Sequence, residues 1–226
     1  MLQEIERPPL LVDILVREIL ESIVGGQLNP KDRITEVNLS AQFNVSRTPL
    51  REALFRLESL GFIKKSANSR WEVVSLQVQD IVEKYEIVNM LENNAILRST
   101  EEARTLIFPK LDSLIKAMKE HLPDKNYQLY REVDGKFHRC LFELHKNDYA
   151  KTIYDQMVLY FKWIRTWAIS PYMDIRLSFE DHQAIVLNLK EHKINETIRV
   201  LDRHHYRIRE GVKREMNLKS SSFKNR

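Results

Sequence analysis

Several kinds of residue are scarce in this chain of 226 residues, and each scarcity excludes a class of protein. Five glycines are too few for the many tight turns of a strand-rich fold, which favours helices. The single cysteine, Cys140, cannot form a disulfide within the chain. The apolar runs are short and interrupted by charge, which excludes a membrane-spanning helix, and the first residues show no pattern of a secretory signal. We therefore expect a cytoplasmic, mainly α-helical protein with no membrane partner.

The first third of the chain combines helical spacing with a change of period. Apolar residues recur at helical spacing in residues 10–25 and 36–43, and Thr35 can cap the second of these helices. A third helix is expected between Ser46 and Gly61. Two short strands are then predicted, at residues 62–65 and 71–74. Three helices followed by a hairpin predict a winged helix-turn-helix, so we assign residues 1–76 to a DNA-binding domain.

The remainder of the chain has the pattern of an all-helical domain. Helices are predicted at residues 78–100, 102–122, 127–146, 149–169, 173–191 and 193–216. We assign residues 77–217 to a bundle of about six helices, and the polar, basic residues 218–226 to a flexible tail.

The third helix carries the residues expected to read DNA. Residues 44–70 hold six basic side chains against two acidic ones, a balance that suits contact with phosphate. Arg47 and Arg51 are four positions apart, so they share a face away from the leucines, and arginine can bind guanine O6 and N7. Ser46 and Thr48 can hydrogen-bond phosphates. The alternative is that these arginines only keep the helix soluble.

This helix resembles the DNA-binding domain of the GntR superfamily of bacterial regulators. The resemblance lies in Ser46–Leu54, SRTPLREAL, followed by Leu57 and Gly61. It implies that Arg47, Thr48 and Arg51 contact operator DNA and that homodimers read a short palindrome in the double strand. One departure is the turn before the second helix, which is Pro-Gly in the family and Pro30-Lys31 here.

The predicted hairpin is the second place where the chain departs from that family. Lys65 and Arg70 flank its tip, where they can reach the DNA backbone or the minor groove. The family has a glycine-rich wing here, but residues 68–71 read NSRW and contain no glycine. The expected DNA contacts therefore rest on the helix more than on the wing.

One carboxylate and three histidines in the second domain have the spacing of metal ligands. Asp134 and His138 are four apart on one predicted helix, so their side chains meet on one face. His182 lies on a later helix, and His204 falls in the apolar stripe of the last helix and points into the bundle. His205 is the rival of His204, because we expect only one of these neighbours to point inward. The set suits zinc, nickel, manganese or iron better than calcium; the alternative is a surface pair beside satisfied core histidines.

Residues 78–215 resemble the FCD domain of the FadR-like branch of GntR regulators, and six helices suit its shorter, VanR-type form. The matching stretches are 134–138, DGKFH, and 182–185, HQAI, followed by the last helix through His204. In that domain an aspartate and three histidines commonly bind a divalent metal next to an effector pocket. The resemblance therefore implies a metal, zinc first, at the four residues Asp134, His138, His182 and His204.

The effector site is expected to differ from the family pattern. The family often has an arginine three residues before the acid that matches Glu92, and this arginine often supports an acidic ligand; this chain has Asn89 there. Arg165, on another helix of the bundle, can supply the missing charge. Asn89 and Arg165 are therefore the candidate effector contacts.

These patterns together predict a transcription regulator rather than an enzyme. We expect a repressor whose operator affinity is controlled by a small organic acid, bound beside the metal. One alternative is a metal-dependent hydrolase that uses the Asp/His site. No separate acid beside the ligands stands out as a general base, and a hydrolase leaves the recognition helix unexplained. A second alternative is a metal-free bundle that only dimerises the DNA-binding domains.

Overall fold

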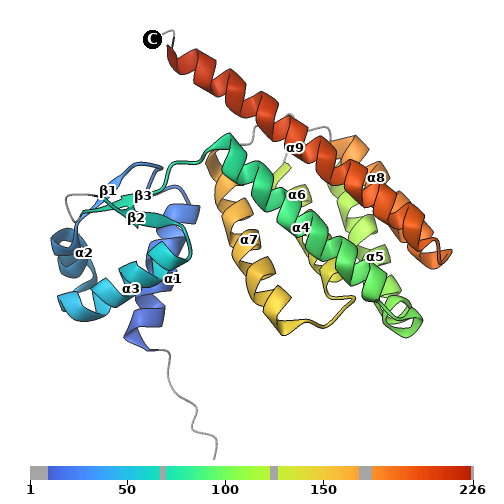
Figure 1. The fold of residues 1–226 in the computed structure, drawn as a ribbon, viewed down its shortest axis with the longest axis horizontal. Coiled ribbons are helices and arrows are strands. Elements are labelled where there is room, and N and C mark those ends of the chain that lie inside the picture. The colour runs from blue at the N-terminus through green and yellow to red at the C-terminus, as the bar shows by residue number, and fades with distance from the viewer. Residues whose placement is uncertain (1–9, 67–69, 123–126, 168–174, 225–226) are drawn as a thin grey trace, which may run out of the picture. The chain divides into compact units, whose positions relative to one another are not determined.

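The computed structural model describes residues 10–66, 70–122, 127–167 and 175–224, with the side chains of residues 127, 165–167 and 218–224 left out. The fold is mainly helical, as predicted (Figure 1). Its contacts divide the chain into two compact units. The first comprises Met1–Gln77 and Leu159–Trp167, and the second comprises Val78–Val158 and Ala168–Arg226. No helix of the described residues has both the length and the apolar character needed to cross a membrane.

The first unit contains a winged helix-turn-helix. Its helices are α1 (Leu11–Val24), α2 (Glu36–Phe43) and α3 (Arg47–Ser59). Its antiparallel sheet has the order β1-β3-β2, from β1 (Arg33–Ile34), β2 (Ile63–Lys65) and β3 (Trp71–Val73). The sequence did not predict β1, because two residues are too few to show an alternating pattern. The predicted cap of α2 is confirmed, since Thr35 Oγ1 accepts a hydrogen bond from the Asn38 backbone N–H at 3.3 Å.

The recognition helix α3 is held by its leucine face. Leu50, Leu54 and Leu57 are fully buried, and α3 packs against α1. Gly61 follows the helix with a φ of 80°, a left-handed conformation that glycine adopts without strain, and the chain turns there into β2. Because the leucines take the buried face, the opposite face of α3 is left exposed to carry its basic residues.

The turn before α2 contains a strained residue. Lys31 has a φ of 74°, and its backbone N–H donates to the Val73 carbonyl at 2.9 Å, which ties this conformation to the sheet. A residue with a Cβ destabilises the folded state by about 1–2 kcal/mol when it adopts the left-handed conformation. Replacement by glycine removes this strain, but about 0.5–1 kcal/mol of the benefit is lost because glycine has greater conformational freedom in the unfolded chain. The Lys31→Gly variant is therefore expected to be about 0.5–1 kcal/mol more stable in urea unfolding. Asn44, with a φ of 51°, is the matched control: Asn44→Gly should change stability less, because asparagine tolerates this region. A loss of stability in Lys31→Gly contradicts the interpretation.

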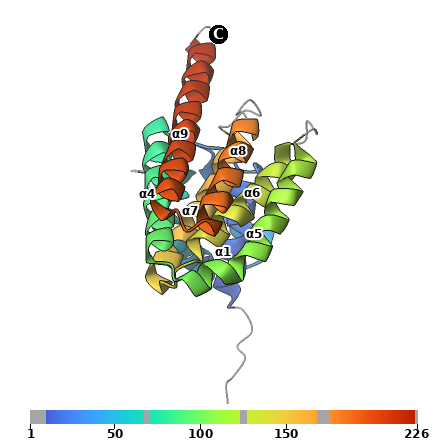
Figure 2. The same ribbon diagram turned by 90° about the vertical axis from the view of Figure 1, so that its right-hand side faces the viewer.

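The regular secondary structure of the second unit is helical in the residues that the structure describes. They are α4 (Val78–Arg98), α5 (Glu101–His121), α6 (Tyr127–Phe142), α7 (Asp148–Trp167, whose last part belongs to the first unit), α8 (Ile175–Lys190) and α9 (Ile194–Lys224). α9 packs against α4 and α8, and α5 packs against α6 and α8 (Figure 2). The helix bounds follow the predicted ranges closely, with one larger correction. α9 runs to Lys224 instead of ending near 216, because no proline follows to stop it.

The core of this helical unit contains polar groups among its apolar side chains. Its fully buried apolar residues include Ile96, Leu111, Met118, Phe137, Cys140, Leu141, Ile185, Leu189 and Leu201. Among the described residues, buried polar groups are Glu92, Asp181, His182, Thr197, His204 and His205. Buried charged groups cost free energy unless they are paired or bind a metal, so this cluster needs an explanation.

Candidate metal centre and nucleic-acid interface

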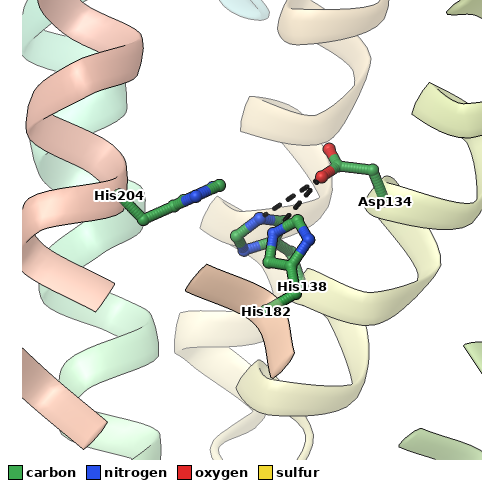
Figure 3. A group of neighbouring side chains, drawn as sticks. All are labelled: Asp134, His138, His182 and His204. Atoms are coloured by element: carbon green, nitrogen blue, oxygen red, sulfur yellow. Dashed lines mark ion pairs between the residues drawn. The ribbon is translucent and has the colours of Figure 1, made fainter. Parts of the chain in front are cut away.

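The four predicted metal ligands come together inside the helical unit. Asp134 and His138 lie on α6, His182 on α8 and His204 on α9. One ligand atom from each residue lies within 4.8 Å of the ligand atoms of the others. Figure 3 shows the three imidazoles and the carboxylate turned toward a common centre. The helical spacing of Asp134 and His138 thus brings both onto one face of α6, where their side chains lie close to His182 of α8 and His204 of α9.

The aspartate links two of the histidines. Asp134 Oδ1 lies 3.4 Å from His182 Nε2 and 3.9 Å from His138 Nε2 (Figure 3). The other ring nitrogen of His182, Nδ1, lies 3.5 Å from the Tyr130 hydroxyl. His204 Nδ1 faces the carboxylate of Asp181 at 3.8 Å. In His182 and His204 the Nδ1 atoms therefore face side chains behind them, which leaves the Nε2 atoms directed at the centre.

The chemistry of these nitrogens fits a divalent transition metal. The Nε2 atoms of His182 and His204 are buried and have no hydrogen-bond partner, and a buried polar atom without a partner costs about 1–3 kcal/mol. Burial lowers the pKa of His204 to about 4 and lowers the pKa of His182 well below its usual value. Both rings are therefore neutral near pH 7, the form in which imidazole binds metal. Three imidazoles and one carboxylate are a donor set that suits zinc.

A second buried carboxylate, Glu92 on α4, lies behind His138. Its Oε2 is 3.0 Å from His138 Nδ1 and 2.9 Å from His205 Nε2, and its Oε1 accepts a 2.9 Å hydrogen bond from the Tyr154 hydroxyl. The side chain has no exposed surface. Burial raises the pKa of Glu92, but charge interactions and hydrogen bonds with His138 and His205 lower it by more, and the net result is a pKa far below the usual range. Glu92 is therefore an ionised carboxylate.

The expectation that only one of His204 and His205 points inward is wrong. The two residues are 1% and 2% exposed. Since α9 packs against both α4 and α8, its buried face is wide enough for adjacent residues to face different helices. His204 joins the group with Asp134, whereas His205 faces Glu92 on α4.

Glu92 is a site residue that was not predicted from the sequence, although its position carried a signal. Glu92 continues the apolar stripe of α4, in which Tyr85, Val88 and Ile96 are buried at helical spacing. An acidic residue in such a stripe is buried and must find partners. Asp181, next to His182, was missed as well; it accepts hydrogen bonds from Arg203 and Arg207 at 2.6 and 2.7 Å.

The two candidate effector contacts do not join this cluster in the described part of the chain. The Asn89 side-chain amide donates to Asp202 Oδ1 at 2.8 Å, beside the equivalent bond from Asn93 at 2.7 Å. The side chain of Arg165 lies outside the described residues. A role of Asn89 or Arg165 in binding an effector stays a prediction.

The residues expected to contact DNA line the exposed start of α3. Ser46, Arg47, Thr48 and Arg51 are all exposed. Arg51 is held in place by Glu36 of α2, whose Oε2 accepts from the arginine Nε at 2.7 Å. The same carboxylate accepts a 3.3 Å bond from Trp71 Nε1 through its other oxygen. Three elements of the winged helix thus orient one arginine on the recognition helix.

The wing holds its lysine against aromatic rings. Lys65 Nζ lies 5.3 Å from the centre of the Phe55 ring and 5.4 Å from that of Trp71. Arg70 is exposed at the start of β3, and residues 67–69 lie outside the described part. Contact of Lys65 or Arg70 with DNA stays a prediction.

Comparison with known proteins matches both parts of the chain to families. Residues 11–73 match the bacterial regulatory proteins of the gntR family, and residues 83–207 match the FCD domain. The Nta operon transcriptional regulator of Aminobacter aminovorans is 30% identical over 176 residues, which cover 76% of this chain and 80% of that protein. The HTH-type transcriptional regulator YdhC of Bacillus subtilis (strain 168) is 29% identical over 144 residues, or 62% of this chain and 63% of that relative.

Further similarities agree with these two families. The gluconate operon transcriptional repressor of Bacillus subtilis (strain 168) is 24% identical over 148 residues, covering 62% of this chain and 57% of the repressor. A solved structure of a Rhodococcus sp. RHA1 protein that carries the GntR designation shares the fold, with a TM-score of 0.71, 15% identity, and coverage of 89% of this chain and 96% of that one. These families and relatives are transcriptional regulators and not enzymes, which speaks against the hydrolase alternative. The chain is a DNA-binding transcriptional regulator and belongs to the GntR family, with an FCD domain as its second part.

Proposed function

We propose that the protein represses transcription in the cytoplasm as a homodimer, and that a small organic acid bound beside a divalent metal in the FCD domain controls its affinity for operator DNA. Residues 1–76 bind the DNA, and residues 77–217 bind the effector and form the dimer. The observation that carries this proposal is the group of Asp134, His138, His182 and His204, which directs unpartnered buried nitrogens at one centre.

The metal is expected to be zinc, held by these four residues. Bound there, the ion supplies a positive charge that a carboxylate oxygen of an organic acid can approach. The protein contributes neutral imidazoles, a carboxylate and a surrounding shell of buried residues, including Phe137 and Tyr130. This arrangement favours a small acidic ligand over a neutral one because the metal carries more charge than its single carboxylate ligand cancels.

The DNA is expected to meet the exposed start of α3. Arg47 and Arg51 reach base edges in the major groove, Ser46 and Thr48 bind phosphates, and a dimer places two copies of α3 on the halves of a palindrome. The proposal of repression draws support from the relative described as the repressor of the gluconate operon. The effector regulates the protein only if it binds the DNA-competent and DNA-incompetent states with different affinity.

The proposal is tested with an operator selected from random duplexes by the zinc-loaded protein. Fluorescence anisotropy then measures the operator Kd with and without chelator, and with acetate, succinate, citrate, gluconate or benzoate. At least one acid is expected to change Kd about tenfold or more in the zinc-loaded protein, equal to a coupling of roughly 1.4 kcal/mol, and to have no effect after metal removal. If neither the metal nor any acid changes Kd, the helical domain serves dimerisation alone and the proposal fails.

A further inference from the structure

Two groups of ionisable side chains meet at His138, and each has the composition of a metal site. The first is the Asp134 group described above, and the second consists of Glu92, His138 and His205. We infer that Glu92 is a positioning residue that sets the tautomers of His138 and His205, and that its group is not a second metal site. This inference rests on the proposed metal at the Asp134 group.

The two nitrogens of His138 face different groups. Nδ1 lies 3.0 Å from Glu92 Oε2, and Nε2 lies on the side of Asp134 Oδ1, at 3.9 Å. A neutral imidazole carries its proton on one nitrogen and a lone pair on the other. With Nδ1–H donating to the Glu92 carboxylate, the lone pair is on Nε2, the nitrogen on the side of the Asp134 group. Acidic partners of this kind commonly fix the orientation of histidine ligands.

The state of the buried nitrogens and oxygens separates the two groups. In the Asp134 group, the Nε2 atoms of His182 and His204 are buried and lack hydrogen-bond partners. In the Glu92 group, the atoms that face one another have partners: Oε2 lies within hydrogen-bond distance of His138 Nδ1 and of His205 Nε2. The unpartnered buried atom of this group, His205 Nδ1, is the ring nitrogen that does not face Glu92. A metal ion would restore lost interactions in the first group, whereas in the second it would displace hydrogen bonds that already exist.

The second carboxylate oxygen of Glu92 also has a hydrogen-bond donor. Oε1 accepts the hydrogen bond from Tyr154 at 2.9 Å, so the carboxylate faces a phenol on α7, an imidazole on α6 and an imidazole on α9. A carboxylate is only an acceptor, which assigns the donor role to all three partners. His205 therefore carries its proton on Nε2. Hydrogen bonds of Glu92 thereby connect α4 to α6, α7 and α9 beside His138.

The test uses the full chain, purified without a histidine tag, in its wild-type, Glu92→Gln and Tyr154→Phe forms. Zinc per chain is measured by elemental analysis, zinc affinity by competition with a chelator, and the tautomers of His138 and His205 by nitrogen-15 NMR of the metal-free protein. Glutamine keeps the shape of Glu92 but loses its charge, and is expected to weaken zinc binding about 10–100-fold while binding stays at one zinc per chain. Tyr154→Phe keeps Oε2 and both of its imidazole partners, and should weaken zinc binding less than threefold.

Each result decides the inference. A proton on Nδ1 of His138 and on Nε2 of His205 in the metal-free wild type supports it, and the opposite tautomer of His138 overturns it, even if Glu92→Gln does not fold. Two zinc ions per wild-type chain, falling to one in Glu92→Gln, would make the Glu92 group a second metal site and also overturn it. Unchanged zinc affinity in Glu92→Gln contradicts the positioning role alone, whereas absence of zinc from the wild type contradicts the proposed metal and leaves the tautomers as the deciding measurement.

Discussion

Replacing Arg47 and Arg51 together by alanine is expected to weaken operator binding by about 30- to 10⁴-fold. A good arginine contact to guanine is worth roughly 1–3 kcal/mol, so the loss of two such contacts amounts to roughly 2–6 kcal/mol. Both side chains are exposed on α3, and Arg51 pairs with the half-buried carboxylate of Glu36, so the fold should survive the substitutions. Fluorescence anisotropy with the selected operator measures the effect, and circular dichroism checks that the helices are intact.

A matched control separates base reading from general charge. Arg17→Ala removes one exposed arginine from α1, which pairs with Glu18 at 3.6 Å, and should change the operator Kd less than threefold at moderate salt. The double variant should also lose discrimination between the operator and a scrambled duplex, because base contacts carry sequence information. Operator affinity equal to that of the wild type in the double variant would remove α3 from the DNA interface.

The second large effect is expected from His204→Ala, which removes one ligand from the Asp134 group. Zinc affinity should fall by about 100-fold or more, since even residues that only support a ligand typically cost 10–100-fold. Zinc at 100 times its Kd stabilises the folded wild type by about 2.7 kcal/mol, and this gain should fall to about 0.4 kcal/mol or less in the variant at the same zinc concentration. Zinc content and thermal unfolding, each measured with and without added zinc, report the change.

His192→Ala is the control for that variant. His192 is an exposed histidine in the turn between α8 and α9 that lies 3.9 Å from Glu101, outside both histidine groups. It should bind zinc with wild-type affinity. Because His204 is buried, its removal also leaves a cavity, so the comparison rests on the difference between zinc-loaded and metal-free stability within each variant. An undiminished zinc-dependent gain in His204→Ala would exclude His204 as a ligand.

Much of the architecture follows from spacing along the chain. Apolar residues at helical intervals located the helices to within a few residues, apart from the C-terminal end of α9, and the motif around Arg47 and Arg51 located the recognition helix. Those patterns are local, because one face of a helix is defined by residues three and four positions apart. The short strand β1 was not predicted, because it is defined by its pairing with Trp71 and Glu72 of β3 and not by a pattern of its own.

The predicted metal site shows where local reasoning reaches its limit. The four ligands were identified from their types and their helical positions, and the structure brings them within 4.8 Å of one another. The same reasoning kept His205 only as a rival of His204 and gave Glu92 no role, because it treated α9 as a helix with one narrow buried face. Packing of α9 against both α4 and α8 widens that face and buries neighbouring histidines on two sides.

The order of residues along the chain is therefore sufficient to identify a winged helix-turn-helix, a helical second domain and four candidate ligands, because each of these depends on periodicity or on a contiguous motif. The surroundings of those ligands depend on contacts between distant residues. Glu92 and His205 are 113 positions apart, and Glu92 and Tyr154 are 62 apart. No local pattern encodes such a meeting, since it follows from the antiparallel packing and rotation of whole helices. That packing assigns His204 to the metal group and His205 to the carboxylate behind it.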